Sequence, residues 1–239
     1  MRIASLVSGG GSTMQAVFEA IKSGELPGVE VGLVIASKPT AGAIQKALAS
    51  GLLESKVVVL RPKSFATEQI FGEEIIRHCM EAGIDVVCQH GWLPHTPKVV
   101  IARYAGRITN QHPGALDPGR PDFGGKYMHG LAVHYAQRKF AELTDGNWFT
   151  EATAQFVHPV YDRGEVIARQ RMEFDADDTT ETIAARLLPI EHRLQIEMLR
   201  NLRDDAVQIL EREVPLVNPK FIPQLEEAKR LAHEKYPNG

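Results

Sequence analysis

Short apolar segments alternate with longer segments of helical pattern through the first half of the chain. The segments 14–24, 41–51 and 66–82 are long enough for helices. Between and around them lie runs of residues typical of strands, at 3–7, 31–36, 57–60, 84–88 and 107–111. Strand–helix–strand succession gives parallel strands with helices on both faces. The pattern therefore predicts an α/β fold of three layers, α/β/α, around a mostly parallel central sheet.

The second half has a different order of elements. A loop rich in Gly, Pro and Asp at 112–125 is followed by a helical pattern at 128–143. Two β-type runs, 152–160 and 166–174, flank the turn 161–164 and predict an antiparallel hairpin at the edge of the sheet. Thr179 or Thr180 can cap a helix through Arg203, and a charged helix follows Asn218-Pro219. We expect one domain at 1–205 and a C-terminal helical appendage at 206–239.

Composition is that of an ordinary soluble protein. Of the 239 residues 44% are hydrophobic and 24% charged, and the net charge of −3 gives no general attraction to nucleic acid. We find neither an apolar run long enough to span a membrane nor a signal-peptide pattern, so a cytoplasmic protein with no membrane partner is expected. Cys79 and Cys88 are expected to be reduced, mostly buried thiols.

A glycine-rich loop at 8–14 joins the first expected strand to the first expected helix. It contains three consecutive glycines at 9–11. Backbone amides in such a loop, and at the start of the following helix, bind anions. Met14 stands where a dinucleotide fingerprint needs a small residue, and the Lys of a Walker loop is absent. A site for one phosphate group remains, beside the alternative of a tight turn with Ser12 or Thr13 capping the helix.

An amide and an imidazole lie near the end of the strand expected at 107–111. Asn110 and His112 are two positions apart and so face the same way, and Pro113 stops the strand. Ligands of open α/β sheets gather at the carboxyl ends of strands. Both side chains can donate to an oxygen that becomes negative, and the imidazole can also move protons. The pair therefore indicates acyl-transfer chemistry.

A carboxylate that orients the imidazole would assist this chemistry. Asp162, in the turn of the expected hairpin, is the candidate, and Gly164 indicates that the turn is strained or closely packed. Sequence spacing alone leaves Asp117, Asp122 and Asp145 as alternatives.

Other catalytic motifs are absent from the sequence. The nine histidines include no His-Glu-x-x-His, and there is no cysteine pair at metal-ligand spacing. The Gly-x-Ser-x-Gly of serine hydrolases is also absent. We expect no bound metal.

Five segments, in order, resemble the folate-dependent formyltransferases: "SGGGSTMQA", "GWL", "YAGRITNQHPG", "DFGGKYMHGLAVH" and "VYDRGEVIARQ". The resemblance runs from residue 1 to about 200. It implies a Rossmann-like formyltransferase fold, 10-formyltetrahydrofolate as co-substrate and a primary amine as acceptor. The branch it is most similar to formylates 5'-phosphoribosylglycinamide in de novo purine biosynthesis. Small-molecule substrates, no nucleic acid, and a monomer or homodimer are expected.

The resemblance also implies roles for individual residues. It implies that the catalytic residues are Asn110, His112 and Asp162. Phosphate binding is implied for the glycine loop and a lysine, namely Gly10, Gly11, Ser12, Thr13 and Lys126. Folate binding is implied for one short segment, Trp92, Leu93, Pro94, His95 and Thr96. Glu191 is implied to bind the acceptor, and His134 borders it.

Two departures from the family pattern leave the acceptor open. Gln155 stands where the family usually has a histidine, with His158 three residues on, and the segment between His112 and Asp162 is longer than usual. The alternatives are another amine, such as an amino sugar nucleotide, or hydrolysis of formyltetrahydrofolate. Enzymes that formylate initiator tRNA usually carry a C-terminal nucleic-acid-binding domain, and 206–239 does not resemble one. A silent folate- or nucleotide-binding module is the non-enzymatic alternative, and the presence of all three expected catalytic residues argues against it.

Overall fold

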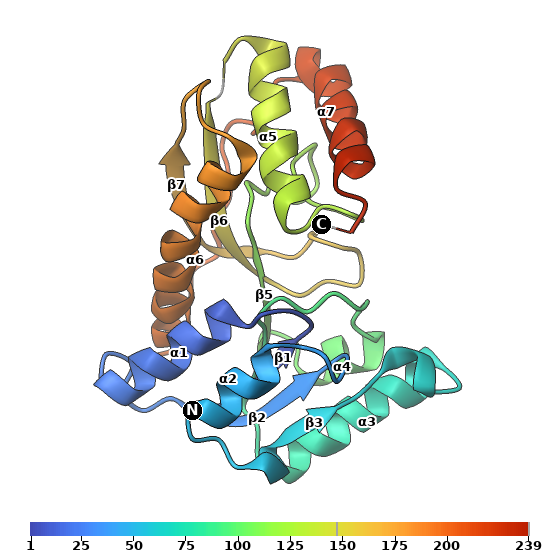
Figure 1. Ribbon diagram of the computed structural model, residues 1–239, viewed down its shortest axis with the longest axis vertical. Coiled ribbons are helices and arrows are strands. Elements are labelled where there is room, and N and C mark those ends of the chain that lie inside the picture. Colours follow the sequence, from blue (N-terminus) through green and yellow to red (C-terminus); the bar gives the residue numbers. More distant parts are fainter. Residues whose placement is uncertain (147, 239) are drawn as a thin grey trace. The chain divides into compact units, whose positions relative to one another are not determined.

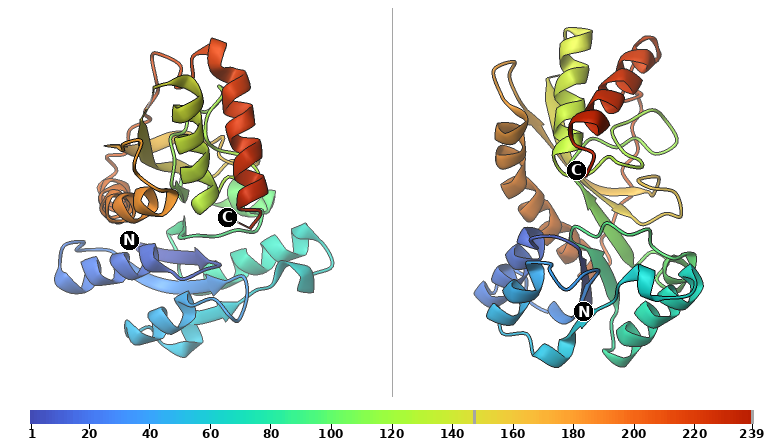
Figure 2. Two further views of the ribbon diagram at one scale, coloured as in Figure 1. Left: turned by 45° about the horizontal axis from the view of Figure 1, so that its top comes forward. Right: turned by 45° about the vertical axis from the view of Figure 1, so that its right-hand side comes forward.

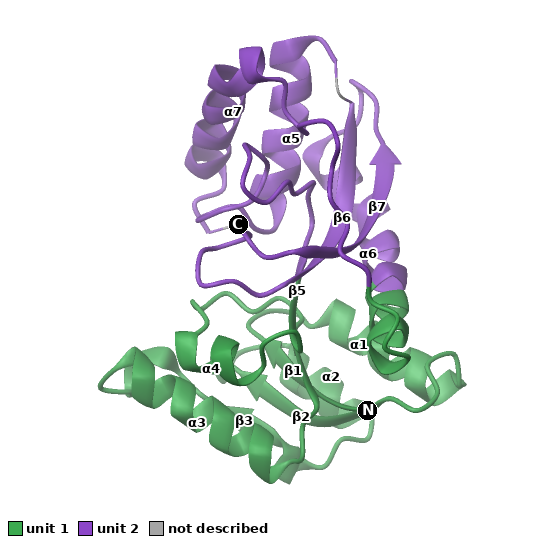
Figure 3. Ribbon diagram, turned by 180° about the vertical axis from the view of Figure 1, so that it is seen from behind, with its two compact units in different colours: residues 1–110, 195–207 green, residues 111–194, 208–239 purple. Residues whose placement is uncertain are grey.

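The computed structural model describes residues 1–146 and 148–238, and its strands form a seven-stranded sheet (Figure 1). The strand order is β3-β2-β1-β4-β5-β6-β7. Pairs from β3 to β5 are parallel, and β6 pairs with β7 in antiparallel fashion at the end of the sheet. The predicted α/β class, with its parallel sheet and antiparallel edge hairpin, is confirmed. The chain forms two compact units, residues 1–110 with 195–207, and residues 111–194 with 208–239 (Figure 3).

The first unit is a parallel sheet with helices on its two sides. Its elements are β1 (Arg2–Val7), α1 (Ser12–Ser23), β2 (Glu30–Ala36), α2 (Ala43–Ala49), η1 (Glu54–Lys56), β3 (Val57–Val59), η2 (Pro62–Ser64), α3 (Glu68–Glu81), β4 (Val86–Gln89), α4 (Lys98–Arg103) and the start of β5 (Ile108–His112). Helices α1 and α2 lie on one side of these strands, and α3 and α4 on the other (Figure 2). Ile3, Leu6 and Val7 of β1 are fully buried, as expected for a strand covered on both faces.

The second unit contains the hairpin and the later helices. Its elements are the end of β5, α5 (Leu131–Thr144), β6 (Phe149–Phe156), β7 (Val166–Glu173), most of α6 (Thr180–Arg203), η3 (Pro219–Phe221) and α7 (Ile222–Lys235). Helices α5 and α7 lie side by side (Figures 1 and 2). Their apolar faces share one core cluster, which includes Ala132, Phe140, Leu225 and Ala228.

Some element boundaries differ from those predicted. Strand β6 spans Phe149–Phe156 rather than 152–160, because the chain leaves the sheet before His158 and Pro159, where the His158 ring accepts a hydrogen bond from the Val160 amide. Helix α4 was not predicted, since its six residues are too few to show a helical period. Helix α1 begins after Gly11 with no side-chain cap, so the capping alternative for Ser12 or Thr13 was wrong.

The predicted division at residues 205 and 206 stays a prediction. Within 206–238, α7 packs against α5, and Gly239 lies outside the described residues. None of the helices in the described part of the chain combines the length and the apolar character needed to cross a membrane.

Candidate active site

The glycine loop lies at the carboxyl end of β1 and leads into α1. Gly9 and Gly10 are exposed, with open space where side chains would be. Gly11 has φ 68°, and a Cβ there would lie 2.5 Å from the Cβ of Ala43, so both its conformation and its packing need glycine. No side chain caps α1 at its N-cap residue Gly11, and the first amides of a helix have no acceptor within the helix. The role of this loop in binding an anion stays a prediction.

The segment predicted to bind folate is the loop after β4, the strand beside β1. Trp92 is buried and stacks on Phe71, with ring centroids 6.3 Å apart. Leu93 is 49% exposed, and its amide donates to Ser8 Oγ at 3.0 Å, which ties this loop to the glycine loop. Thr96 accepts from Gln89. The folate-binding role of this segment stays a prediction.

Three other predicted site residues, Pro94, His95 and Asn110, belong to the first unit. The Nδ1 atom of His95 lies 3.0 Å from Glu68 Oε1, and Pro94 is partly buried. Asn110 is paired in register with Gln89, the last residue of β4. Strand β5 continues from Asn110 into the second unit, where His112 is its last residue.

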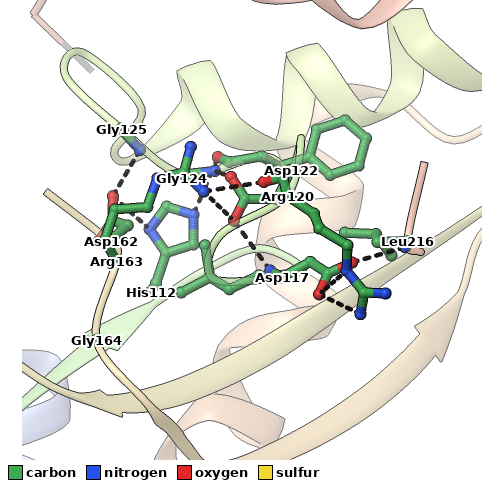
Figure 4. A network of polar contacts seen from close by, with 12 residues as sticks. His112, Asp117, Arg120, Asp122, Gly124, Gly125, Asp162, Arg163, Gly164 and Leu216 are labelled. Atoms are coloured by element: carbon green, nitrogen blue, oxygen red, sulfur yellow. Dashed lines mark hydrogen bonds and ion pairs between the residues drawn. The ribbon is translucent and has the colours of Figure 1, made fainter. Parts of the chain in front are cut away.

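His112 is buried beside Asp162 in the second unit. The Nδ1 atom of His112 lies 3.7 Å from Asp162 Oδ2, and the two side chains are 3% and 9% exposed (Figure 4). The other ring nitrogen, Nε2, lies 3.2 Å from the carbonyl oxygen of Phe123. Both ring nitrogens therefore face oxygen atoms, Nδ1 that of Asp162 and Nε2 that of the Phe123 carbonyl.

Asp162 is held from two sides. The amide of Gly125 donates to Asp162 Oδ2 at 2.9 Å, and Gln155 Nε2 donates to Asp162 Oδ1 at 2.8 Å. The same Gln155 accepts from the amide of Gly164 through Oε1 at 3.1 Å. Asp162 has φ 54°, which is tolerated better by Asp and Asn than by most residues. These bonds fix the carboxylate that faces His112.

The turn after Asp162 is as closely packed as its glycine indicated. A Cβ at Gly164 would lie 1.6 Å from the carbonyl oxygen of Phe156. No other residue fits this position, and the backbone amide of Gly164 is thereby brought to Gln155.

The other aspartates considered from the sequence have different surroundings. Asp122 accepts from the amides of Asp117 and Gly124 and pairs with Arg163 at 3.1 Å (Figure 4). Asp117 pairs with Arg120. Asp145 lies at the end of α5 with φ 49°. Asp162 is the aspartate that the structure places beside His112.

Glu191 is buried in α6 and accepts a hydrogen bond from Gln111 at 2.9 Å. Burial raises the pKa of Glu191 to about 7, against the effect of that hydrogen bond. A carboxyl group that is partly protonated near neutral pH can either donate or accept a hydrogen bond.

The remaining predicted residues differ in their exposure. Lys126 is exposed, with its ammonium 4.9 Å from the centroid of the Tyr127 ring. His134 is buried in α5, and burial, together with the charge of His112, lowers its pKa to about 4. His129 has a lowered pKa for the same two reasons, while Asp162 acts in the opposite direction. A neutral His134 is suited to hydrogen bonding rather than to charge pairing.

Within the second unit the structure therefore brings together His112 and Asp162. In the first unit it ties the glycine loop to the folate segment through Ser8. Sequence reasoning marked Gln155 only as a departure from the family and missed its bonds to Asp162 and Gly164. Gly125 and the Phe123 carbonyl were also missed, although the Gly124-Gly125 pair signals a close backbone approach.

Neither cysteine takes part in this arrangement. Cys79 and Cys88 are free and buried, and burial raises the pKa of each thiol to about 12. Among residues 1–146 and 148–238, no group of three or more His, Cys, Asp or Glu side chains is placed to hold a metal ion.

The fold and these residues define a Rossmann-like α/β protein with an Asn-x-His-Pro strand end and a histidine paired with an aspartate. The chain belongs to the formyl transferase family, whose model, described as "Formyl transferase", matches residues 1–199.

Three proteins illustrate the relationship. The chain is 30% identical over 222 residues to the chloroplastic phosphoribosylglycinamide formyltransferase of Arabidopsis thaliana, covering 93% of this chain and 72% of that protein. It is 25% identical over 224 residues to phosphoribosylglycinamide formyltransferase of Escherichia coli, covering 94% and 97%. The crystal structure of phosphoribosylglycinamide formyltransferase from Brucella melitensis matches with a TM-score of 0.71 at 32% identity, covering 88% and 98%.

Proposed function

We propose that the chain transfers the formyl group of 10-formyltetrahydrofolate to the amine of 5'-phosphoribosylglycinamide, a step of de novo purine biosynthesis. The observation that carries the proposal is the buried His112, whose ring lies 3.7 Å from Asp162 at the end of β5. The family match over residues 1–199 and the names of the relatives support it.

In this proposal the amine nitrogen attacks the formyl carbon. A carbon–nitrogen bond forms to the acceptor, the carbon bond to N10 of the folate breaks, and one proton passes from the acceptor amine to N10. Asn110 and protonated His112 donate to the oxyanion, which is the largest contribution that fixed donors make to acyl transfer. Asp162 holds the ring of His112 and assists proton movement through water. No covalent enzyme intermediate is required.

The contact between His112 Nε2 and the Phe123 carbonyl adds one step to this mechanism. The Nε2 proton that fits the Phe123 carbonyl is the proton available to the formyl oxygen. We propose that the formyl oxygen replaces this carbonyl as the acceptor when substrates bind, while the contact with Asp162 is kept.

Substrate binding is assigned to the flanking segments. The acceptor phosphate is proposed to bind the amides of Gly10, Gly11, Ser12 and Thr13 with the help of Lys126. Glu191 is proposed to bind the acceptor, with His134 nearby. The folate is proposed to bind at residues 92–96, where Leu93 is exposed.

The setting of the enzyme is part of the proposal. We propose a cytoplasmic monomer or homodimer that acts on small molecules and binds no nucleic acid. Residues 1–205 are proposed as the catalytic domain, with 206–239 as a helical appendage to it.

The test is an assay with alternative acceptors. Purified protein and 10-formyltetrahydrofolate are offered 5'-phosphoribosylglycinamide, an amino sugar nucleotide, or buffer alone, and both tetrahydrofolate release and the formylated product are followed. We expect product only with 5'-phosphoribosylglycinamide, and its loss in the His112→Gln variant. Equal release in buffer alone would identify a hydrolase, and binding of folate without turnover would identify a silent module; either result would refute the proposal.

A further inference from the structure

The chain continues beyond the part that the family model matches, and this continuation is bound to the loop after His112. Residues 208–238 belong to the same compact unit as that loop. Arg212 Nε donates to the carbonyl of Leu116 at 3.0 Å, and the amide of Leu216 donates to Asp117 at 2.8 Å. The C-terminal segment therefore supplies donors to the loop along much of its length.

Lys229 of α7 also contacts this loop. Its ammonium donates to two backbone carbonyls, that of Asp122 at 3.0 Å and that of Gly124 at 2.5 Å. Burial lowers the pKa of Lys229, and so does the charge of Arg163, while Asp122 and Asp162 act in the opposite direction. A desolvated ammonium is a strong donor, so these two carbonyls are firmly held.

The intervening carbonyl and the next amide face His112 and Asp162. The Phe123 carbonyl lies 3.2 Å from His112 Nε2, and the Gly125 amide donates to Asp162 Oδ2 at 2.9 Å (Figure 4). One four-residue segment, 122–125, is thus bonded to Lys229 through its first and third carbonyls and to the histidine–aspartate pair through the groups between and after them.

A second contact lies one turn further along α7. The ring of His233 stacks on that of Tyr127, with centroids 4.2 Å apart. Lys229 and His233 are four positions apart and so share one face of the helix. Tyr127 has φ 71°, an unfavourable conformation for a bulky residue, and this contact helps to keep it there.

We propose that Lys229 is a positioning residue for His112 and Asp162, and that α7 acts as a clamp on segment 122–125. The tests of this inference that measure turnover rest on the proposed function, and the test by NMR does not. In this proposal the C-terminal helix α7 contributes to turnover by positioning His112 and Asp162, and its role is not purely structural.

The first test compares Lys229→Met with Lys235→Met, the same change at an exposed position of the same helix. Lys229→Met is expected to lower kcat on the order of tenfold or more, because small displacements of reacting groups are costly. KM for both substrates should stay within about threefold, since Lys229 donates to two backbone carbonyls and is not among the residues proposed to bind substrate. Lys235→Met should leave both constants unchanged. Equal kcat values in the two variants, or a change in KM alone, would overturn the proposal.

A chemical rescue separates the ammonium from the bulk of the side chain. In Lys229→Cys, alkylation with 2-bromoethylamine restores a lysine-like ammonium, and the native Cys79 and Cys88 are protected by burial. Wild-type protein treated in the same way is the control. Recovery of at least half of the lost kcat is expected; full alkylation without recovery would contradict the proposal.

A measurement that needs no turnover distinguishes this inference from the proposed function. The ring resonances of His112, assigned by their loss in His112→Gln, are followed by NMR against pH. Lys229→Met should shift these resonances, because the Phe123 carbonyl beside the ring is no longer held, whereas Lys235→Met should not. If the wild type forms no formylated product but the shift occurs, the proposed function fails and the clamp stands. If product forms and the shift is absent, the clamp fails.

Discussion

The hydrogen bonds around Asp162 allow stability and catalysis to be separated by exchanging an amide and a carboxylate. In Asp162→Asn the new side chain tolerates the φ of 54° and keeps the shape of the turn. It offers one carbonyl oxygen, however, to two donors, the Gly125 amide and Gln155 Nε2. One donor in a buried site must therefore lose its acceptor.

The cost of this loss follows from the geometry. A hydrogen bond to a charged acceptor contributes about 1.5–3 kcal/mol, and a buried unpaired donor costs a similar amount. We expect Asp162→Asn to lower the free energy of unfolding by about 2 kcal/mol. For a chain of this size, that loss corresponds to a decrease in Tm of roughly 4–8 °C. Gln155→Glu alone should cost about as much at neutral pH, because it places a second carboxylate beside that of Asp162.

The double variant Gln155→Glu/Asp162→Asn restores a match between donors and acceptors, with the negative charge at residue 155 instead of residue 162. The new carboxylate accepts from the Asn amide group and from the Gly164 amide, and the Asn oxygen accepts from Gly125. Stability should return to within about 1 kcal/mol of wild type, which makes the two changes strongly non-additive. The carboxylate no longer faces His112, so kcat should remain lower by about a hundredfold or more.

Urea unfolding of the four proteins gives the coupling energy, and steady-state turnover with 5'-phosphoribosylglycinamide gives kcat. Additive losses of stability would show that the bonds of Gln155 to Asp162 and Gly164 do not exist as described. Recovery of both stability and kcat in the double variant would show that the charge at residue 162 is not needed beside His112.

Three further predictions concern single groups. His112→Gln should lower kcat on the order of a hundredfold through loss of one oxyanion donor, measured by product formation. The pKa of about 7 at Glu191 means that the folded state retains a proton which the unfolded state releases near pH 4.5, so stability is lost as pH rises from about 4.5 to 7. The loss, about 3 kcal/mol, should be absent in Glu191→Gln when urea unfolding is compared at pH 5 and 8. Cys79 and Cys88, with pKa values of about 12, should react with a thiol reagent at pH 8 only after unfolding.

Sequence reasoning could place part of the site because strand ends follow from the order of strands and helices. The carboxyl ends of β1, β4 and β5 carry the glycine loop, the 92–96 loop and the Asn110-x-His112 pair, and parallel pairing brings such ends to one edge. The period of the apolar residues was enough to place the glycine loop and the Asn110-x-His112 pair, whereas the 92–96 segment was implied only by the resemblance to the formyltransferases.

The partner of His112 could not be derived in the same way. Asp117, Asp122 and Asp162 all lie in polar, glycine-containing loops, and nothing in their spacing distinguishes them. The choice depends on the hairpin, whose first strand ends at Phe156, and on the Gly164 turn, which has room for no side chain. Lys229 gave no signal because a lysine among the charges of α7 has the pattern of a solvated helix face.

Gln155, which stands where the family usually has a histidine, supplies both the donor and the acceptor that this position needs. Asp162 needs a donor on Oδ1, and the Gly164 amide needs an acceptor at the same place. A single carboxamide supplies both, with its NH₂ toward the aspartate and its oxygen toward the glycine. A histidine could meet both needs only as one neutral tautomer, and would lose its acceptor on protonation. Because a carboxamide does not titrate, Gln155 donates to Asp162 and accepts from Gly164 without any change in its own protonation state.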